Sequence, residues 1–233
     1  MHSTEKAMHS TEREDLTVNL GRLAGAMAHD FNNVLMSVLQ ASEMLARFYP
    51  DDPRLIRIAD QLSAAVARGS RITSDVVRFS HPLEPVVRQF DVLKWLALRI
   101  PEIESVVAGR GVRLHFEVPE TEVTTSSDPE LLRGALVQLV ANACDAMPLG
   151  GDLTVVLTQR EDHVQLRISD TGSGMPPKTL EQIFEPLFTT KRQRTGLGLS
   201  VVHQSVTASG GTIDVESTPG AGTTFTIMLP RAG

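Results

Sequence analysis

The sequence is poor in cysteine and in aromatic residues, and each shortage removes a class of protein. The single cysteine, Cys144, excludes an internal disulfide and any metal site built from several cysteines, and a lone thiol suits a reducing compartment. Aromatic residues make up only 4% of the chain. This scarcity excludes a binder built on aromatic contacts and favours helix-rich packing by Leu, Val, Ala and Met.

A basic excess and a long apolar run are also missing. Lys and Arg number 22 against 28 Asp and Glu, a net charge of -6, so no duplex-DNA surface is expected and nucleic acid is not predicted as a partner. No run approaches the roughly 18 consecutive apolar residues of a membrane span, and the charged N-terminus does not resemble a signal peptide. We expect a soluble, cytoplasmic chain without a membrane span, or a soluble piece of a longer protein.

Apolar material is ample, since 41% of the 233 residues are hydrophobic, and it is enough for one or two domains. The near-repeat at Met1–Glu5 and Met8–Glu12 has too few copies for a coiled coil. The prolines Pro82 and Pro85 mark a linker. The expected segments are a tail or expression remnant over residues 1–15, a helical hairpin over 16–80, a linker over 81–90, and an α/β domain over 91–233.

Periodic apolar residues predict the hairpin. They recur every three or four positions from Leu16 to Leu45, stop at a turn-forming stretch over residues 48–53, and resume from Leu55 towards Ser80. Two antiparallel helices of this length cannot enclose their own apolar stripes. We therefore expect a homodimer that forms a four-helix bundle through the hairpin.

The remaining sequence alternates between helical and strand patterns. Strands clustered late, with helices between them, favour an α+β sandwich in which helices cover one face of a mixed sheet. We expect helices over residues 92–107 (bent at Pro101), 129–147 (capped by Asp128) and 198–208, and strands over 112–118, 153–158, 164–169, 212–216 and 223–229.

The first stretch with chemical potential lies on the helix at 129–147. Gln138 and Asn142 are one turn apart and share a face, in a run that ends Asp145-Ala-Met147. Amide oxygens are neutral ligands that suit Mg²⁺, which usually arrives with nucleotide phosphates. The polar face of an ordinary amphipathic helix explains this stretch equally well on its own.

Two glycine-bearing stretches follow it along the chain. In Asp170-Thr-Gly172-Ser-Gly174-Met175, a carboxylate at a strand end can accept from an exocyclic amine, and bare backbone can lie against a flat base. In Thr195-Gly196-Leu-Gly198, glycines at a helix start expose N–H groups that suit phosphate oxygens. Each stretch alone fits a plain turn, but their occurrence together and in order favours a nucleotide site.

His29 stands apart from the other histidines. On a helical wheel it lies about 160° from the centre of the apolar stripe, which makes a core position improbable and leaves an exposed imidazole able to receive a phosphoryl group. Asn33, four residues later, shares that exposed face. The other six histidines lack the spacing of a metal site.

Together these motifs resemble those of sensor histidine kinases. The Asn142 stretch, Asp170-x-Gly172-x-Gly174, Phe184-Glu-Pro-Leu-Phe188 and Gly196-Leu-Gly198 are similar to the N, first glycine, F and second glycine boxes of their ATP-binding domain. That domain belongs to a wider ATPase family with gyrase, the ninety-kilodalton heat-shock chaperone and the mismatch-repair protein. Ala28-His29-Asp30-Phe-Asn-Asn33 resembles the phosphoacceptor box of the nitrogen-regulation and hybrid-kinase branch, so the resemblance covers Leu16 to Pro230.

The resemblance implies a two-component kinase that autophosphorylates His29 with ATP and Mg²⁺ and passes the phosphoryl group to an aspartate of a response-regulator receiver domain. It assigns Asp30 as the general base, Asp30 and Asn33 to dephosphorylation of the partner, and Asn142 with Gln138 to the metal. The implied nucleotide contacts are Asn142, Asp145, Asp170, Gly172, Gly174, Met175, Phe184, Lys191, Thr195, Gly196, Leu197 and Gly198.

Two alternatives remain open. A gyrase-type or mismatch-repair-type ATPase uses a Glu one turn before the metal-binding Asn to activate water, but this chain has Gln138, which cannot accept that proton. A scaffold that keeps the fold without nucleotide or chemistry is the other alternative, and the intact Asn142, Asp170 and Gly198 argue against it. Two departures from the family are Gln138 in place of the commoner Asn and Arg194 at a usual Gly position.

Overall fold

The computed structural model describes residues 30–80, 83–191 and 194–232. The chain divides into two compact units. One consists of Met1–Pro82 and Lys191–Leu197, and the other of Leu83–Thr190 and Gly198–Gly233. Among the described residues, no helix combines the length and the apolar character needed to cross a membrane.

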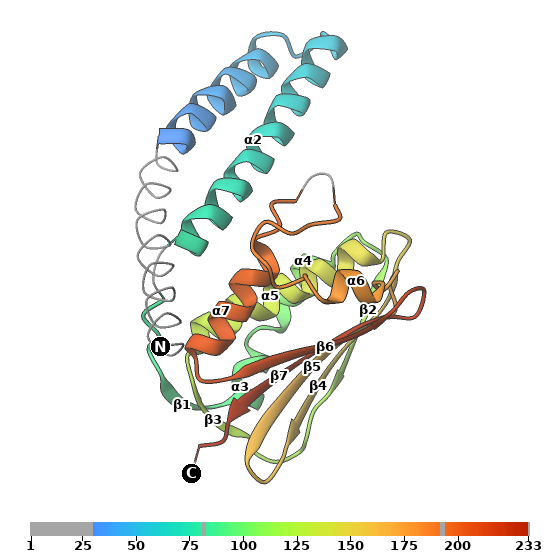
Figure 1. Ribbon diagram of the computed structural model, residues 1–233. Coiled ribbons are helices and arrows are strands. Elements are labelled where there is room, and N and C mark those ends of the chain that lie inside the picture. The colour runs from blue at the N-terminus through green and yellow to red at the C-terminus, as the bar shows by residue number, and fades with distance from the viewer. Residues whose placement is uncertain (1–29, 81–82, 192–193, 233) are drawn as a thin grey trace, which may run out of the picture. The chain divides into compact units, whose positions relative to one another are not determined.

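The first unit contains the expected helical hairpin (Figure 1). Its described part begins with a helix over residues 30–48, and the part of this helix expected before residue 30 lies outside the described residues. The second helix, α2, covers Pro53–Ser80. The Asp52 carboxylate accepts hydrogen bonds from the backbone N–H groups of Arg54 at 2.8 Å and Leu55 at 3.4 Å, so it caps the start of α2.

Small residues bring the two helices of the hairpin close together. The hydroxyl oxygens of Ser42 and Ser63 lie 3.0 Å apart, and Ser42 is fully buried. Gly69 packs on Leu35 so closely that a Cβ at residue 69 would lie 2.8 Å from a Leu35 methyl carbon. Because the later residue of α2 meets the earlier residue of the first helix, the helices run antiparallel.

The second unit is built on a five-stranded mixed sheet with the strand order β2-β4-β5-β7-β6. β2 runs parallel to β4, and the other neighbours pair antiparallel, so the predicted mixed sheet is confirmed. The strands cover Val112–Glu117 (β2), Gly151–Gln159 (β4), His163–Asp170 (β5), Thr212–Thr218 (β6) and Gly222–Pro230 (β7).

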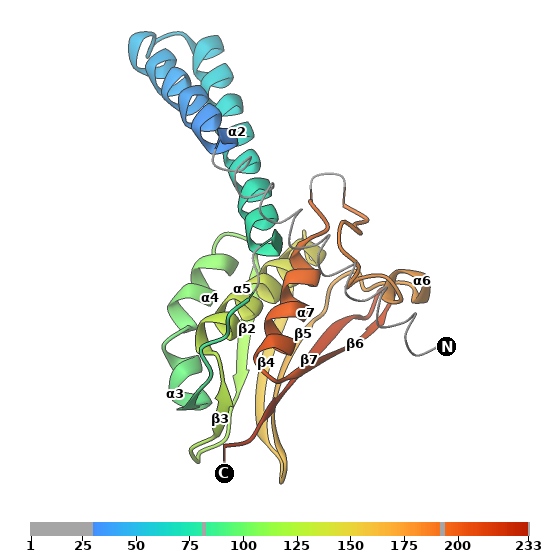
Figure 2. The same ribbon diagram turned by 60° about the vertical axis from the view of Figure 1, so that its left-hand side comes forward.

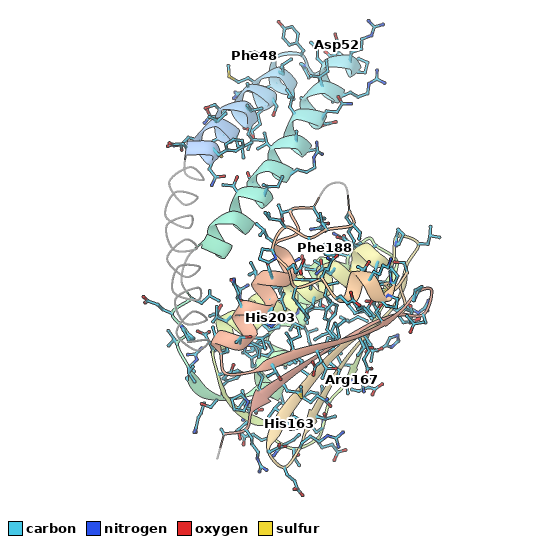
Figure 3. All side chains as sticks on the ribbon, viewed as in Figure 1. Phe48, Asp52, His163, Arg167, Phe188 and His203 are labelled. Atoms are coloured by element: carbon cyan, nitrogen blue, oxygen red, sulfur yellow. The ribbon has the colours of Figure 1, made fainter. Side chains whose placement is uncertain are left out.

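Helices cover one face of this sheet, as predicted (Figures 1 and 2). They are α4 (Ile100–Val107), α5 (Pro129–Ala146) and α7 (Gly198–Ala208). Along β5, Leu166 and Ile168 are buried, while Arg167 between them is exposed on the opposite face (Figure 3). This alternation places the core between the sheet and the helices and leaves the other face polar.

The segment before α5 differs from the predicted single helix over 92–107. The structure has two helices there, α3 (Val92–Ala97) and α4, and Pro101 lies in the first turn of α4 instead of bending a longer helix. Proline is tolerated in a first turn because its missing N–H has no helical partner there. The prediction of one bent helix was therefore wrong.

A second, two-stranded sheet was not predicted. β1 (Arg88–Asp91) pairs antiparallel with β3 (Thr124–Ser127), so regular structure begins inside the stretch expected as a linker over 81–90. A short helix, α6 (Pro177–Leu180), was also missed. Both strands are four residues long and mostly polar, so their sequences show no apolar alternation.

Candidate functional site

The helix α5 presents three polar residues within two turns. Gln138 and Asn142 are half-buried, and the Gln138 Nε2 donates a hydrogen bond of 3.2 Å to Asn142 Oδ1. One turn further along, Asp145 has a side chain that is 17% exposed. The spacing predicted from sequence is thus realised, and Gln138 holds the amide of Asn142 in one orientation.

Asp170 ends β5 and is buried. Its Oδ1 accepts a hydrogen bond of 2.8 Å from the backbone N–H of Gly172. A Cβ at Gly172 would lie 2.7 Å from the Ala146 carbonyl oxygen and 2.8 Å from Asp170 Oδ1. The glycine therefore lets the carboxylate and the end of α5 approach each other with no side chain between them.

The turn after Asp170 is held from two sides. The Ser173 N–H donates to the carbonyl of Ala146 at 3.0 Å, which ties the turn to the end of α5. The Met175 N–H donates to Ser217 Oγ at 2.8 Å, which ties it to β6. Gly174 has a φ of +61°, and a Cβ there would run into the carbonyl of Thr218, so only glycine fits. This turn is a rigid, bare stretch of backbone beside a buried carboxylate.

The start of α7 reaches the same part of α5. A Cβ on Gly198 would lie 2.5 Å from the Gln138 Nε2, so the missing side chain lets α7 pack directly on the amide that orients Asn142. Phe184 stacks at a tilt on His203 of α7, with ring centroids 5.3 Å apart. In the same segment, Phe188 (Figure 3) is partly buried against the core. Leu187 is exposed and has a φ of +68°.

The segment before α7 belongs to the other compact unit. Within it, Thr195 Oγ1 accepts a hydrogen bond from the Leu197 N–H at 3.3 Å, and Gly196 has a φ of +72°. Lys191 is exposed, Arg194 is half-buried, and residues 192–193 are not described. The structure thus gathers Asn142, Gln138, Asp145, Asp170, Gly172, Gly174, Met175, Phe184 and Gly198 in one unit, with Lys191, Thr195, Gly196 and Leu197 in the other.

The expected phosphoacceptor, His29, lies outside the described residues. The two residues predicted to act with it, Asp30 and Asn33, are described, and both are exposed on the helix over 30–48. The Asn33 carbonyl accepts a hydrogen bond from Ser37 Oγ at 3.0 Å, so a side chain as well as the backbone holds this turn of the helix. The side chains of Asp30 and Asn33 are thus both accessible to solvent on this helix.

Sequence reasoning missed one charged residue beside α5. An Arg110 guanidinium nitrogen lies 3.2 Å from Asp145 Oδ1. Burial raises the pKa of the Cys144 thiol, the charge of Arg110 opposes that rise, and the carboxylates of Asp145 and Asp170 add to it. Arg110 is thus in contact with Asp145, although no spacing in the sequence links the two residues.

The donor set on α5 fits a magnesium ion that is bound mainly by a nucleotide. Asn142 offers an amide oxygen, which is the hard type of ligand that Mg²⁺ prefers. Within the described part of the chain, His, Cys, Asp and Glu side chains form no cluster of three or more that could hold a metal ion. Few protein ligands are needed where phosphates supply the rest.

Comparison with known proteins extends these observations. Residues 127–233 match the family of histidine kinase-, DNA gyrase B-, and HSP90-like ATPases. The chain is 32% identical to a sensor histidine kinase, ZraS, of Klebsiella oxytoca over 99% of this chain and 50% of that protein. It is 34% identical to the sensor kinase CckA of Brucella abortus over 91% of this chain and 24% of that protein. The chain thus spans half or less of the length of these relatives.

Solved structures share the fold. Full-length ShkA in complex with AMPPNP matches with a TM-score of 0.76 and 22% identity, over 91% of this chain and 46% of that one. Histidine kinase ThkA, in complex with response regulator protein TrrA, matches with a TM-score of 0.70 and 21% identity, over 100% of this chain and 67% of that one. The chain therefore carries a histidine kinase-, DNA gyrase B-, and HSP90-like ATPase domain at residues 127–233, and it is homologous to sensor histidine kinases along almost its whole length.

Proposed function

We propose that this chain is the catalytic core of a two-component histidine kinase, which uses MgATP to phosphorylate His29 and then transfers the phosphoryl group to an aspartate of a response-regulator receiver domain. The observation that carries the proposal is the convergence, in one unit, of the Asn142 amide on α5 and the buried Asp170 carboxylate beside a bare glycine turn. The exposed Asp30 and Asn33 on the hairpin support the second part of the proposal, an acceptor segment at His29.

The site residues gathered in the second unit each have a chemical role in binding ATP. The Asp170 carboxylate accepts a hydrogen bond from the exocyclic amine of adenine, and the turn at Gly172 and Gly174 leaves room for the base. The helix start at Gly198 offers backbone N–H groups to phosphate oxygens. Asn142, with Gln138 beside it, would hold Mg²⁺, and the ion would supply positive charge to neutralise the nucleotide phosphates.

The acceptor chemistry belongs to the hairpin. One ring nitrogen of His29 attacks the γ-phosphorus, the bond from that phosphorus to the bridging oxygen breaks, and ADP leaves. Asp30 takes the imidazole proton and so keeps the attacking nitrogen unprotonated. Gln138 cannot activate water as a carboxylate can, so hydrolysis is not the favoured outcome. We also propose that the hairpin dimerises into a four-helix bundle, which covers its outer apolar residues.

Incubating the chain with Mg²⁺ and γ-labelled ATP tests the proposal. We expect an acid-labile label on the protein, lost in His29→Ala and in Asn142→Ala, because the first variant lacks the acceptor and the second the metal ligand. Release of phosphate without labelled protein favours a gyrase-type ATPase. Nucleotide binding without either product favours a scaffold, and each of these results contradicts the kinase proposal.

We further propose that Asp30 and Asn33 serve in dephosphorylating the partner regulator. Both side chains are exposed, and both follow the acceptor position closely in the sequence. Adding the chain and nucleotide to a phosphorylated receiver domain should shorten the lifetime of the phosphoaspartate. An unchanged lifetime with Asn33→Ala, compared with the unsubstituted chain, removes this activity from the proposal.

A further inference from the structure

Arg110 is held beside α5 by backbone contacts as well as by its ion pair with Asp145. It sits between two glycines, Gly109 and Gly111, whose φ values are +72° and +68°. Its own N–H donates to the Val107 carbonyl at 3.1 Å, which closes the turn after α4. The two glycines supply the positive φ values that this tight turn needs and that other residues rarely adopt.

The same turn is docked on the segment that follows α5. The Gly111 carbonyl accepts a hydrogen bond of 3.3 Å from the Gly151 N–H. A Cβ at Gly150, which has a φ of +87°, would run into that same carbonyl, so the two stretches of backbone touch. The position of Arg110 relative to the end of α5 is therefore fixed by main-chain contacts, and its guanidinium is placed within reach of Asp145.

The ion pair itself adds little to folding. The Arg110 side chain is 43% exposed and its contact with Asp145 is 3.2 Å long, and pairs of this kind contribute little to stability in water. A guanidinium has five N–H donors, and the contact with Asp145 involves one of its terminal nitrogens. Most of its donors are therefore available for another acceptor.

The charges around α5 favour a phosphate group as that acceptor. Asp145 and Asp170 put two carboxylates next to a site proposed to take a polyanionic nucleotide, and Arg110 is a cation in contact with Asp145. Asp145 lies one turn from Asn142, on the metal-binding side of the helix. The negative charge of Asp145 repels the nucleotide phosphates, whereas the guanidinium of Arg110 offers them a hydrogen-bond donor with a positive charge.

We propose that Arg110 is a nucleotide-binding residue, anchored by Asp145, which neutralises that carboxylate and donates hydrogen bonds to the phosphate oxygens of the bound nucleotide. The inference rests on the proposed function, because it needs α5 to line an ATP site. It adds to that site a residue from outside the motifs by which the site was recognised. It also explains how the acidic Asp145 is compatible with an anionic ligand.

Titration of the full chain with Mg-AMPPNP, Mg-ADP and adenosine, followed by calorimetry, tests this role. In Arg110→Ala we expect the dissociation constant for Mg-AMPPNP to rise about tenfold, the size of one charge-assisted hydrogen bond. The rise should be smaller for Mg-ADP and absent for adenosine, because the lost contact is to phosphate. Arg110→Lys keeps the positive charge but loses the planar guanidinium. Its dissociation constant for Mg-AMPPNP should lie between those of the unsubstituted chain and Arg110→Ala.

Arg113→Ala is the matched control. Arg113 is three residues away on β2 and pairs with Asp152 through two contacts of 2.8 and 2.6 Å. Arg113 is exposed on the face of the sheet opposite α5. Its neighbours Val112 and Leu114 point to the other face and pack against the core. Its removal changes the net charge equally, and we expect affinity for all three ligands to stay within twofold.

The outcomes separate the two proposals. If the unsubstituted chain binds neither Mg-AMPPNP nor Mg-ADP, the proposed function fails and the role of Arg110 fails with it. If that chain binds them and Arg110→Ala binds them equally well, only the inference about Arg110 is overturned. A loss for adenosine as large as that for Mg-AMPPNP also overturns it, because such a loss reports a distorted pocket instead of a missing phosphate contact.

Discussion

The side-chain amide of Gln138 lies between two residues of the proposed nucleotide site. It donates to Asn142 Oδ1 at 3.2 Å, and it occupies the space that a side chain at Gly198 would need. Gln138 thus joins Asn142, the proposed metal ligand, to the start of α7. The glycine at 198 has a packing reason besides any contact with phosphate, because even a methyl group would push against this amide.

The substitution Asp170→Asn tests the proposed recognition of adenine by the Asp170 carboxylate. The asparagine oxygen can still accept from the Gly172 N–H, so the turn should keep its shape. Its NH₂ group, however, donates where the carboxylate accepted, and it meets the exocyclic amine of adenine, which is also a donor. We expect MgATP affinity to fall by about 1.5–3 kcal/mol.

ITP provides a second test of this role, because its base carries a carbonyl acceptor in place of the exocyclic amine of adenine. Measured by calorimetry in a His29→Ala background, the preference of Asp170→Asn for ATP over ITP should shrink or reverse. Asp214→Asn, which changes an exposed carboxylate on β6, should leave that preference unchanged. An Asp170→Asn variant that binds both nucleotides as the unsubstituted chain does would contradict the assignment.

Local spacing explains which site residues could be predicted from the sequence. Asn142 and Gln138 are one helical turn apart, and Asp170 with its glycines occupies a continuous stretch at a strand end, so a short window contains each signal. Arg110 and Ser217 could not be found this way. Each meets the site through a contact between residues more than thirty positions apart, and only the folded chain brings the partners together.

At the scale of elements, the Asp128 carboxylate fixes the start of α5. One of its oxygens accepts from the N–H groups of Glu130 at 2.8 Å and Leu131 at 3.0 Å, and the other accepts from Val86 at 2.7 Å. Burial alone raises the pKa of this carboxyl, but the three N–H groups and the charge of Arg88 outweigh it and hold the pKa below its usual value. Asp128 therefore joins the segment before β1 to the helix that carries Asn142.

Asp128→Ala should destabilise the second unit by about 1–2 kcal/mol at neutral pH, since a helix cap and a further backbone contact are lost. Because the folded pKa is lowered, this stabilisation is complete above the unfolded pKa and disappears as pH falls through the folded pKa. The difference between variant and unsubstituted chain should thus shrink below about pH 4. Urea unfolding followed by the fluorescence of Trp95 measures it, because Trp95 Nε1 donates to the Pro129 carbonyl at the start of α5.

A serine at position 128 separates the two contacts. Asp128→Ser keeps an oxygen that can cap α5, but one hydroxyl cannot also reach Val86 as the second carboxylate oxygen does. Its loss of stability should therefore lie between zero and that of Asp128→Ala. Equal stability of the alanine variant and the unsubstituted chain, at neutral pH, would show that Asp128 does not hold these elements together.

Element predictions succeeded where periodicity was strong and failed where pairing was distant. α5 and α7 begin at the predicted residues because Asp128 and Gly198 mark their starts. β1 and β3 were missed, since four mostly polar residues carry no apolar alternation and the two strands pair across more than thirty positions. The single helix expected over 92–107 failed because Pro101 was taken as a bend, whereas proline also starts helices.

At the scale of the whole molecule, the hairpin has more apolar surface than its own two helices cover. Along the helix over residues 30–48, Phe31, Val34 and Phe48 are between 59% and 65% exposed. On α2, Ile58 and Ile72 are 46% and 47% exposed. Phe31 and Val34 are three residues apart, and Phe48 follows Val34 by fourteen residues, as Ile72 follows Ile58. Both spacings place residues on roughly the same side of a helix. A second copy of the hairpin, packed in a four-helix bundle, would remove this surface from water.

Val34→Glu tests this arrangement by placing a charge in the proposed interface. Burying an unpaired carboxylate is costly, so we expect sedimentation or light scattering to show the unsubstituted chain at twice its 25.3 kDa mass and Val34→Glu shifted towards the single chain. Met36→Glu is the matched control, because residue 36 is 54% exposed on the same helix but lies about 200° around it from residue 34. It should remain dimeric. A monomeric unsubstituted chain, or equal dissociation of both variants, would mean that the exposed stripe is not a contact between copies, because charge on either side of the helix would then have the same effect.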